Sequence, residues 1–256
     1  MVSRSFRVSA VATIFSVVAI VAGAGTMSDA AVVTYSASDA AAGPTDPRPN
    51  SNAMAANFDT AASALGTLQI ITFESAPLGA FSNLTVAPGV SLSGVDRNGG
   101  SQTIRNTPGG GSGPSDPVSI YGYNTTLGGA NFVYVLGGTL TFTFSTGVQA
   151  FGAYISGIQF AGETITFNDG SFQSVAIPPL GVSDGGVAFV GFTDAGKSIT
   201  SITINAVGSP GGPDFISIDD VRIVANVPPV PEPSTFAIVG LGAMGWAAFK
   251  RRPKRR

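Results

Sequence analysis

Hydrophobic side chains alternate with polar ones along several stretches of this chain, and that period of two constrains the fold most. Leu140, Phe142 and Phe144 alternate with threonines, and Ile202 and Ile204 follow the same rule. Alternation of this kind predicts strands that bury one face only. Strands with one solvated face are typical of antiparallel sheets.

Turn signals separate these stretches at a regular spacing. Gly137-Gly138, Asn168-Asp169-Gly170 and Asp194-Ala195-Gly196-Lys197 each lie between two apolar runs. Around ten strands at such spacing are expected between residues 68 and 224. The sequence therefore predicts an all-β fold, an antiparallel β-sandwich or jelly roll.

One short helix is expected ahead of the strands. Asn52 can cap it, Ala53 to Leu65 favour it, and Gly66 can end it in the left-handed conformation. Residues 31–36 are expected to form a strand before it. The predicted organisation is an N-terminal extension with the helix at 31–66 and a β-sandwich ectodomain at 67–226.

The composition excludes several kinds of chemistry. The 256 residues include no Cys and no His, which excludes disulfides, thiolate zinc sites and Ser-His-Asp catalysis. Nothing in the sequence pairs Glu163 with Asp169 across a cleft, as a glycosidase would need. Fourteen acidic and five basic residues lie between residues 28 and 226, and an acidic chain repels nucleic acid. We therefore expect neither an enzyme nor a nucleic-acid partner.

The N-terminus is typical of a secretory signal peptide over residues 1–30. A short basic region ends at Arg7, an apolar run follows, and small residues precede Ala31. Cleavage after Ala30 or after Ala24 fits this pattern. A permanent membrane anchor is the alternative, because the run approaches the ~20 residues that span a bilayer. In either case the middle of the chain is exported, with the Sec translocon and signal peptidase as expected partners.

The C-terminus combines a proline-rich strip at 227–235 with a hydrophobic segment and basic tail at 236–256. The apolar run from Phe236 to Phe249 would be about 21 Å long as a helix, short for a hydrocarbon core of ~30 Å. The basic cluster is expected to stay cytoplasmic. It consists of Lys250, Arg251, Arg252, Lys254, Arg255 and Arg256.

This order of strip, apolar run and basic end resembles a PEP-CTERM protein-sorting signal. The residues that carry the resemblance are Val230, Pro231, Glu232, Pro233 and Ser234. The resemblance implies a Gram-negative bacterium that makes extracellular polysaccharide. It also implies an exosortase partner, processing near the Pro-Glu-Pro strip, and a precursor held transiently in the inner membrane. A tail anchor with a proline-rich linker is the alternative.

The middle of the chain resembles the jelly-roll ectodomain of many PEP-CTERM proteins and, more distantly, carbohydrate-binding modules. The resemblance rests on short motifs such as Phe73-Glu74 and Ile218-Asp219-Asp220-Val221. In related jelly rolls a Glu after the first strand and an Asp of the last strand bind calcium, which implies a structural calcium ion at Glu74 and Asp219. Asp219 points into the core if its face of the strand is the buried one. The alternative to calcium binding is that Asp219 caps a turn or accepts backbone N–H bonds.

Sugar binding is the main alternative function. Tyr121, Tyr123, Asn124 and Asn131 lie in a glycine-rich stretch, where the rings could stack on sugars and the amides could bind hydroxyls. The tyrosines could equally pack at a strand edge. The expected function is an exported, non-catalytic protein of the cell surface or extracellular matrix. The alternatives are a module that binds extracellular polysaccharide and a secreted hydrolase.

Overall fold

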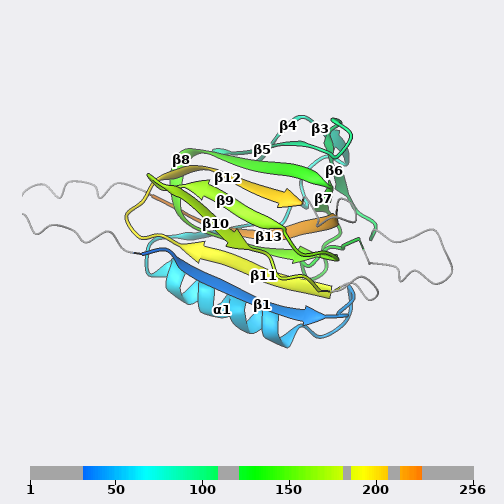
Figure 1. The fold of residues 1–256 in the computed structure, drawn as a ribbon, viewed down its shortest axis with the longest axis horizontal. Helices are drawn as coiled ribbons and strands as arrows, with labels where there is room; N and C mark the ends of the chain where they lie inside the picture. The colour runs from blue at the N-terminus through cyan, green and yellow to red at the C-terminus, as the bar shows by residue number, and fades with distance from the viewer. Residues whose placement is uncertain (1–30, 109–120, 181–185, 207–213, 227–256) are drawn as a thin grey trace, which may run out of the picture.

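The computed structural model describes residues 31–108, 121–180, 186–206 and 214–226. It confirms a mostly β protein with one short helix (Figure 1). The predicted signal peptide, sorting strip and tail helix lie outside the described residues. The elements are β1 (Val33–Ala40), α1 (Pro49–Ser63), β2 (Leu68–Ile71), β3 (Gly79–Phe81), β4 (Asn83–Ala87), β5 (Val90–Val95), β6 (Gln102–Arg105), β7 (Phe132–Leu136), β8 (Gly138–Ser156), β9 (Thr164–Asn168), β10 (Phe172–Ala176), β11 (Gly186–Thr193), β12 (Ile199–Ala206) and β13 (Phe215–Ala225).

The long strand β8 belongs to two sheets. Its first half pairs with β5 and β12, so one sheet has the order β4-β5-β8-β12-β9-β10. Its second half, from Val148, pairs with β11 and β13. The second sheet therefore runs β1-β11-β8-β13, and β13 then pairs with β2 and with β7, which leads on to β6 and β3. All these pairs are antiparallel, as the alternation predicts.

The main core lies between the two sheets. Phe142 and Phe151, from the two halves of β8, are both fully buried, with ring centroids 5.3 Å apart. Phe167 of β9 stacks on Phe192 of β11 at 3.8 Å. The same residues that alternate in the sequence thus form the apolar face of each sheet, which supports the prediction of a β-sandwich.

A third layer covers the outer face of the second sheet. Helix α1 lies along β1 and β11 (Figure 1), and Phe58 packs between Tyr35 and Phe189 with ring centroids 5.5 and 5.4 Å apart. All eight residues of β11 are buried, because one face meets the core and the other meets the helix. Residues 31–66, expected to be an extension, thus supply an edge strand and the covering helix of the same fold.

The helix begins earlier than predicted, and Asn52 is not its cap. Pro49 occupies the first turn, where its missing N–H costs nothing. The orphan N–H groups are bound by Asp39 of β1, whose carboxylate accepts from Asn50 N at 3.1 Å and Ser51 N at 2.8 Å. The hydroxyl of Ser51 also donates to Asp39 at 2.6 Å. A carboxylate at the helix N-terminus also interacts favourably with the helix dipole.

We expect Asp39→Asn to destabilise the fold by about 1 kcal/mol at pH 7. Burial alone raises the pKa of Asp39, but hydrogen bonds from Ser51 and Asn50 outweigh it and leave the pKa below its ordinary value. A pKa that is lower in the folded than in the unfolded state gives stability at pH above the unfolded value. That contribution is lost as the pH falls through the folded pKa.

Urea unfolding at pH 7 and near pH 3 measures the effect. The difference between wild type and Asp39→Asn should shrink at the lower pH. Asp46→Asn, in the exposed loop before the helix, removes the same charge and serves as the control. An equal destabilisation by Asp39→Asn at both pH values would contradict a capping carboxylate.

Two of the predicted turns play different roles. Residues 168–170 join the hairpin of β9 and β10, whose first pair is Asn168 with Phe172. The Gly137-Gly138 link joins β7 to β8 through two positive φ angles, 63° and 74°, but β7 lies in the second sheet and the first half of β8 lies in the first. The glycine pair therefore turns the chain from one sheet to the other.

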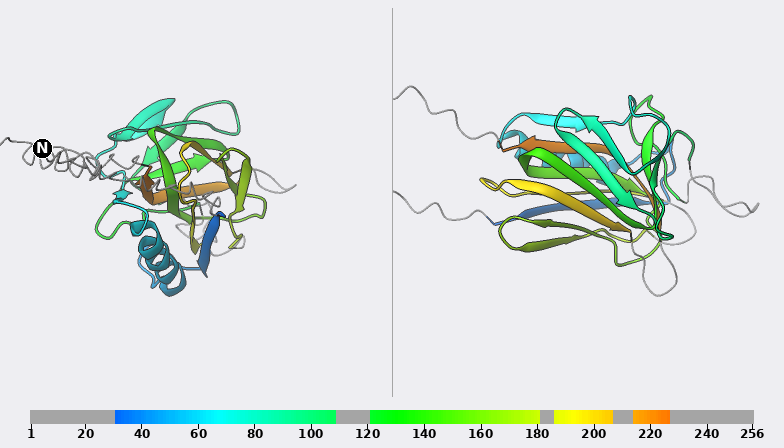
Figure 2. Two further views of the ribbon diagram at one scale, coloured as in Figure 1. Left: turned by 90° about the vertical axis from the view of Figure 1, so that its left-hand side faces the viewer. Right: turned by 90° about the horizontal axis from the view of Figure 1, so that it is seen from above.

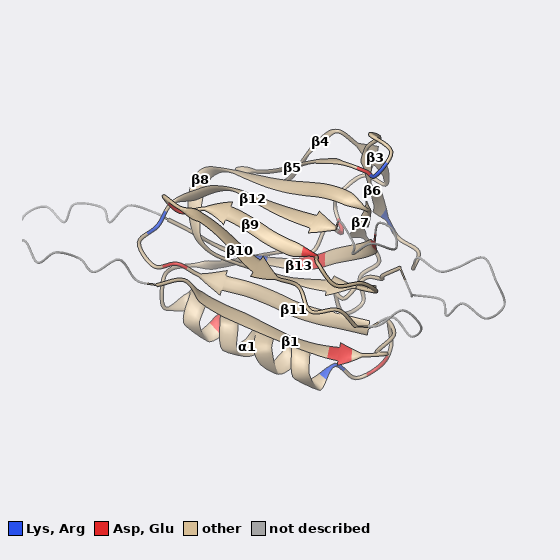
Figure 3. Cartoon of the chain, in the orientation of Figure 1, with Lys and Arg blue, Asp and Glu red and all other residues tan. Residues whose placement is uncertain are grey.

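Charged residues lie mostly near the ends of the elements, and the strand faces are largely uncharged (Figure 3).

Both ends of the described fold lie at one end of the sandwich. Across the second sheet, Val33 pairs with Thr193, Thr193 with Ala150, and Ala150 with Val224. The start of β1 and the end of β13 therefore lie at the same end of the sheet (Figure 2). The loop after β1 and the end of β8 at Ser156 lie at the opposite end.

Candidate functional site

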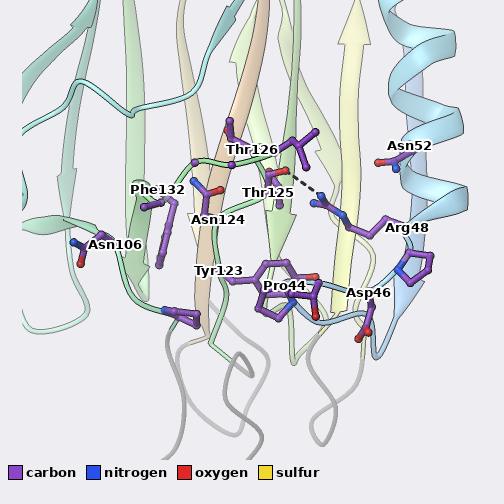
Figure 4. Close-up of a pocket in the computed structure, with 17 residues that line it drawn as sticks. Pro44, Asp46, Arg48, Asn52, Asn106, Tyr123, Asn124, Thr125, Thr126 and Phe132 are labelled. Atoms are coloured by element: carbon purple, nitrogen blue, oxygen red, sulfur yellow. Dashed lines mark hydrogen bonds between the residues drawn. The ribbon is translucent and has the colours of Figure 1, made fainter.

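A cavity of about 640 Å³ lies at that opposite end. The loop between β1 and α1 forms one wall, and the loop before β7, residues 121–131, forms the other (Figure 4). Its polar lining includes Arg48, Asn52, Asn106 and Asn124. Two of the four residues predicted to bind sugar, Tyr123 and Asn124, therefore lie at this cavity.

Tyr123 connects the two walls. Its hydroxyl donates to the carbonyl of Ala42, and its backbone N–H and carbonyl both bind the Ser156 hydroxyl, at 2.9 and 3.1 Å. The preceding Gly122 has φ 97°, and a Cβ there would lie 2.2 Å from the Ser217 hydroxyl, so glycine is required. Burial raises the pKa of Tyr123 well above its ordinary value, which keeps the hydroxyl a donor.

Asp219 holds the middle of the 121–131 loop. It is 1% exposed, and one of its oxygens accepts from Thr125 N at 2.7 Å and Thr126 N at 3.0 Å. Burial, followed by the negative charge of Asp220, raises the pKa of Asp219 to about 7. Asp219 therefore points into the core, and its backbone N–H bonds match the alternative that the sequence analysis gave for it.

The two neighbouring aspartates do not simply point to opposite faces of β13, as strict alternation predicts. Asp220 has φ 47°, and the register of β13 against β8 shifts between Asp219 and Arg222. The chain thus forms a bulge. As a result the carboxylate of Asp220 also reaches this loop and accepts from the Thr126 hydroxyl at 2.8 Å.

Glu74 holds the far end of the same loop. Its carboxylate accepts from Ala130 N at 2.9 Å, from Asn131 N at 3.2 Å and from the amide of Asn124 at 2.9 Å. The amide of Asn131 donates to the carbonyls of Glu74 and Ala76. The two acids implied by the resemblance, Glu74 and Asp219, therefore position one loop between them.

The donor set at these acids fits calcium only in part. Both oxygens of Glu74 and one of Asp219 accept N–H bonds, and the other Asp219 oxygen, Oδ1, is buried without a hydrogen-bond partner in the described structure. The described residues contain no group of three or more Asp, Glu, His or Cys placed to hold a metal. Calcium at this pair thus stays a prediction from the resemblance, with Asp219 Oδ1 as the oxygen that would bind it.

The four residues predicted to bind sugar are engaged within the protein. Tyr123 is 1% exposed, which removes its ring from those that could stack on a sugar. The half-buried ring of Tyr121 packs edge-on against Phe215, with centroids 5.0 Å apart. The amides of Asn124 and Asn131 hold the loop. These contacts favour the packing alternative for both tyrosines.

Three lining residues were missed by the sequence reasoning. Arg48 donates from Nη2 to the Thr125 carbonyl at 3.0 Å and links the two walls (Figure 4). Asn52 and Asn106 are exposed and come from the first helix and the segment after β6. The prolines on either side of Arg48 mark a helix start, but no sequence signal brings Asn106 to the same place.

Residues 229–252 match the family model of the PEP-CTERM protein-sorting motif. The chain carries a PEP-CTERM sorting motif. The match contains all five residues that carry the resemblance, from Val230 to Ser234, and the first three members of the basic cluster. The motif indicates an exported protein with a C-terminal membrane-anchoring signal. It lies outside the described residues, among which no helix is long and apolar enough to cross a membrane.

The sandwich of this chain resembles two solved domains. One is the K2 cleaved adhesin domain of Lys-gingipain, at 14% identity and TM-score 0.40, covering 62% of this chain and 98% of that one. The other is a variant of CBM29-2, a family 29 carbohydrate-binding module, at 14% identity and TM-score 0.33, covering 62% and 92%. At these TM-scores neither likeness assigns a function. No curated protein matches the sequence.

Proposed function

We propose that this chain is an exported, non-catalytic protein of the cell envelope or extracellular matrix of a Gram-negative bacterium. The PEP-CTERM match at residues 229–252 carries the proposal. Signal peptidase and the Sec translocon would deliver the chain to the inner membrane. An exosortase would then read the Pro-Glu-Pro strip and release the β-sandwich from its tail.

A non-catalytic role is supported by the residues that the chain has available. It contains no His or Cys, so nucleophilic catalysis with a histidine base is excluded. Glu163 and Asp214 approach each other, but both are 0% exposed and neither lines the cavity. A glycosidase needs two carboxyl groups that flank a bound substrate, which this pair does not offer.

Intact-mass spectrometry of the protein recovered from cells and from the medium tests the proposal. The mature form should lack both residues 1–30 and the segment after the Pro-Glu-Pro strip. A recovered extracellular form that still ends at Arg256 would refute exosortase processing.

Carbohydrate binding at the cavity is a second candidate, and the polar lining is what favours it. Asn52, Asn106 and Arg48 offer amide and guanidinium groups that can bind sugar hydroxyls or a uronate carboxylate. The aromatic lining residues Tyr123 and Phe132 are 1% and 0% exposed. Binding there would rest on hydrogen bonds rather than on ring stacking.

We expect the full chain, purified in detergent, to bind a polysaccharide saturably on a glycan array. Asn106→Ala combined with Asn52→Ala should weaken that binding about tenfold or more, as expected when two hydrogen bonds of about 1 kcal/mol are lost. Asn57→Ala, on an exposed helix position outside the cavity, is the control. An equal loss of binding in the double variant and in the Asn57→Ala control, or no saturable binding by wild type, would contradict a sugar site here.

A further inference from the structure

Two acids that are 51 positions apart in the sequence meet in the interior. Glu163 directly precedes β9, Asp214 directly precedes β13, and both are 0% exposed. Their carboxyl groups face each other within hydrogen-bonding contact. Neither acid belongs to the cavity described above.

The partners of the two acids are very unequal. Asp214 accepts backbone N–H bonds from Gln159 at 2.7 Å, Phe160 at 3.1 Å and Phe215 at 2.7 Å. Burial raises the pKa of Asp214, and these three donors oppose that shift by stabilising the ionised form. Both oxygens of Glu163 are buried, and neither accepts a hydrogen bond from another described residue's N–H or hydroxyl group. Burial raises the pKa of Glu163 to about 7, and no Lys or Arg is among the described groups that shift it.

Two buried carboxylates in contact require a positive charge between them. A shared proton satisfies one oxygen of each acid and leaves the second Glu163 oxygen buried with no donor from another described residue, which is costly. A hard cation can bind both Glu163 oxygens and the remaining lone pairs of Asp214, because calcium takes carboxylate oxygens singly or in pairs. The unequal partners therefore favour a cation over a proton.

We propose that Glu163 and Asp214 form a calcium-binding pair at the starts of β9 and β13. This pair is separate from Glu74 and Asp219, which position the cavity loop. Calcium there ties the segment after β8 to the last strand. Affinities of about 10⁻⁴–10⁻³ M are usual for extracellular modules, and an exported protein meets calcium in that range.

Thermal unfolding of the full chain in detergent at pH 7, with EDTA and then with about 5 mM calcium chloride, tests the pair. Calcium should raise the Tm of wild type by about 3–10 °C. Glu163→Gln should abolish this rise, and its Tm in EDTA should equal or exceed that of wild type because the repulsion is gone. Asp219→Asn should keep the rise.

The other outcomes overturn the proposal. Loss of the rise in Asp219→Asn with retention in Glu163→Gln would place calcium at the cavity loop. Equilibrium dialysis of wild type needs no variant, and absence of bound calcium at about 5 mM refutes the site. Asp214→Asn replaces Glu163→Gln should the latter not fold. Failure of both variants to fold also counts against the site, because removing a charge from an unpaired acid pair should not destabilise the calcium-free fold.

Discussion

Replacing Pro231, Glu232 and Pro233 together with alanine is expected to leave the C-terminal tail on the protein. Wild type should be recovered from outside the cell without its apolar segment and basic end. The variant should keep Arg256 as its last residue and stay in the membrane fraction. The physical reason is that two prolines hold the strip extended and remove backbone donors, so a membrane enzyme can read it as an unstructured peptide.

Intact-mass spectrometry of each fraction measures this outcome directly. Pro228→Ala changes a proline that lies just outside the matched residues 229–252, and it should be processed like wild type. Processing of the triple variant at the wild-type position would show that the strip is not what the enzyme reads. Loss of processing in Pro228→Ala as well would point to a general linker requirement.

Phe58→Ala is expected to be the most destabilising single substitution discussed here, at about 3–5 kcal/mol. The ring of Phe58 is fully buried between Tyr35 of β1 and Phe189 of β11. Its removal leaves a cavity between the helix and the second sheet. The other buried side chains of the helix, Ser51, Ala55 and Ala62, are small, so they do not replace the apolar contact that the ring provides.

Urea unfolding of the full chain in detergent, followed by circular dichroism, gives the free energy of unfolding. The adjacent Asn57 is exposed, and Asn57→Ala should change that free energy by less than about 0.5 kcal/mol. A Phe58→Ala protein as stable as the Asn57→Ala control would mean that the helix is not part of the cooperative unit.

The sequence predicted those strands that have one buried and one solvated face, because alternation along the strand itself shows this arrangement. Phe142 and Ile204 each lie on a sheet with one solvated face, so their alternation with polar residues is visible in the sequence. Strand β11 breaks that rule because a helix more than a hundred residues earlier covers its outer face. The unbroken run Gly186–Thr193 was a signal of burial on both faces, but the covering element could not be named from it.

Capping and site geometry were less predictable, because they depend on residues far apart in the chain. Pro49 could have marked the helix start, yet the carboxylate that binds the first N–H groups of the helix comes from β1. The sequence left open whether Asp219 points into the core, and it gave no sign of the bulge at Asp220. Glu163 is an acidic residue directly before an apolar strand, but nothing near it in the sequence indicates a contact with Asp214.

The position of the chain ends has a consequence for how such a protein stands on a surface. Val33 and Val224 lie at one end of the second sheet, and the cavity loops lie at the other. Between them, Val148 to Ser156 of β8 spans about 27 Å. A tether through residues beyond 226 would attach at the end of the sandwich opposite the cavity, so about this distance would separate the attachment point from the cavity. Removal of the signal peptide or of the C-terminal tail would take place at the end of the sandwich that is opposite the cavity.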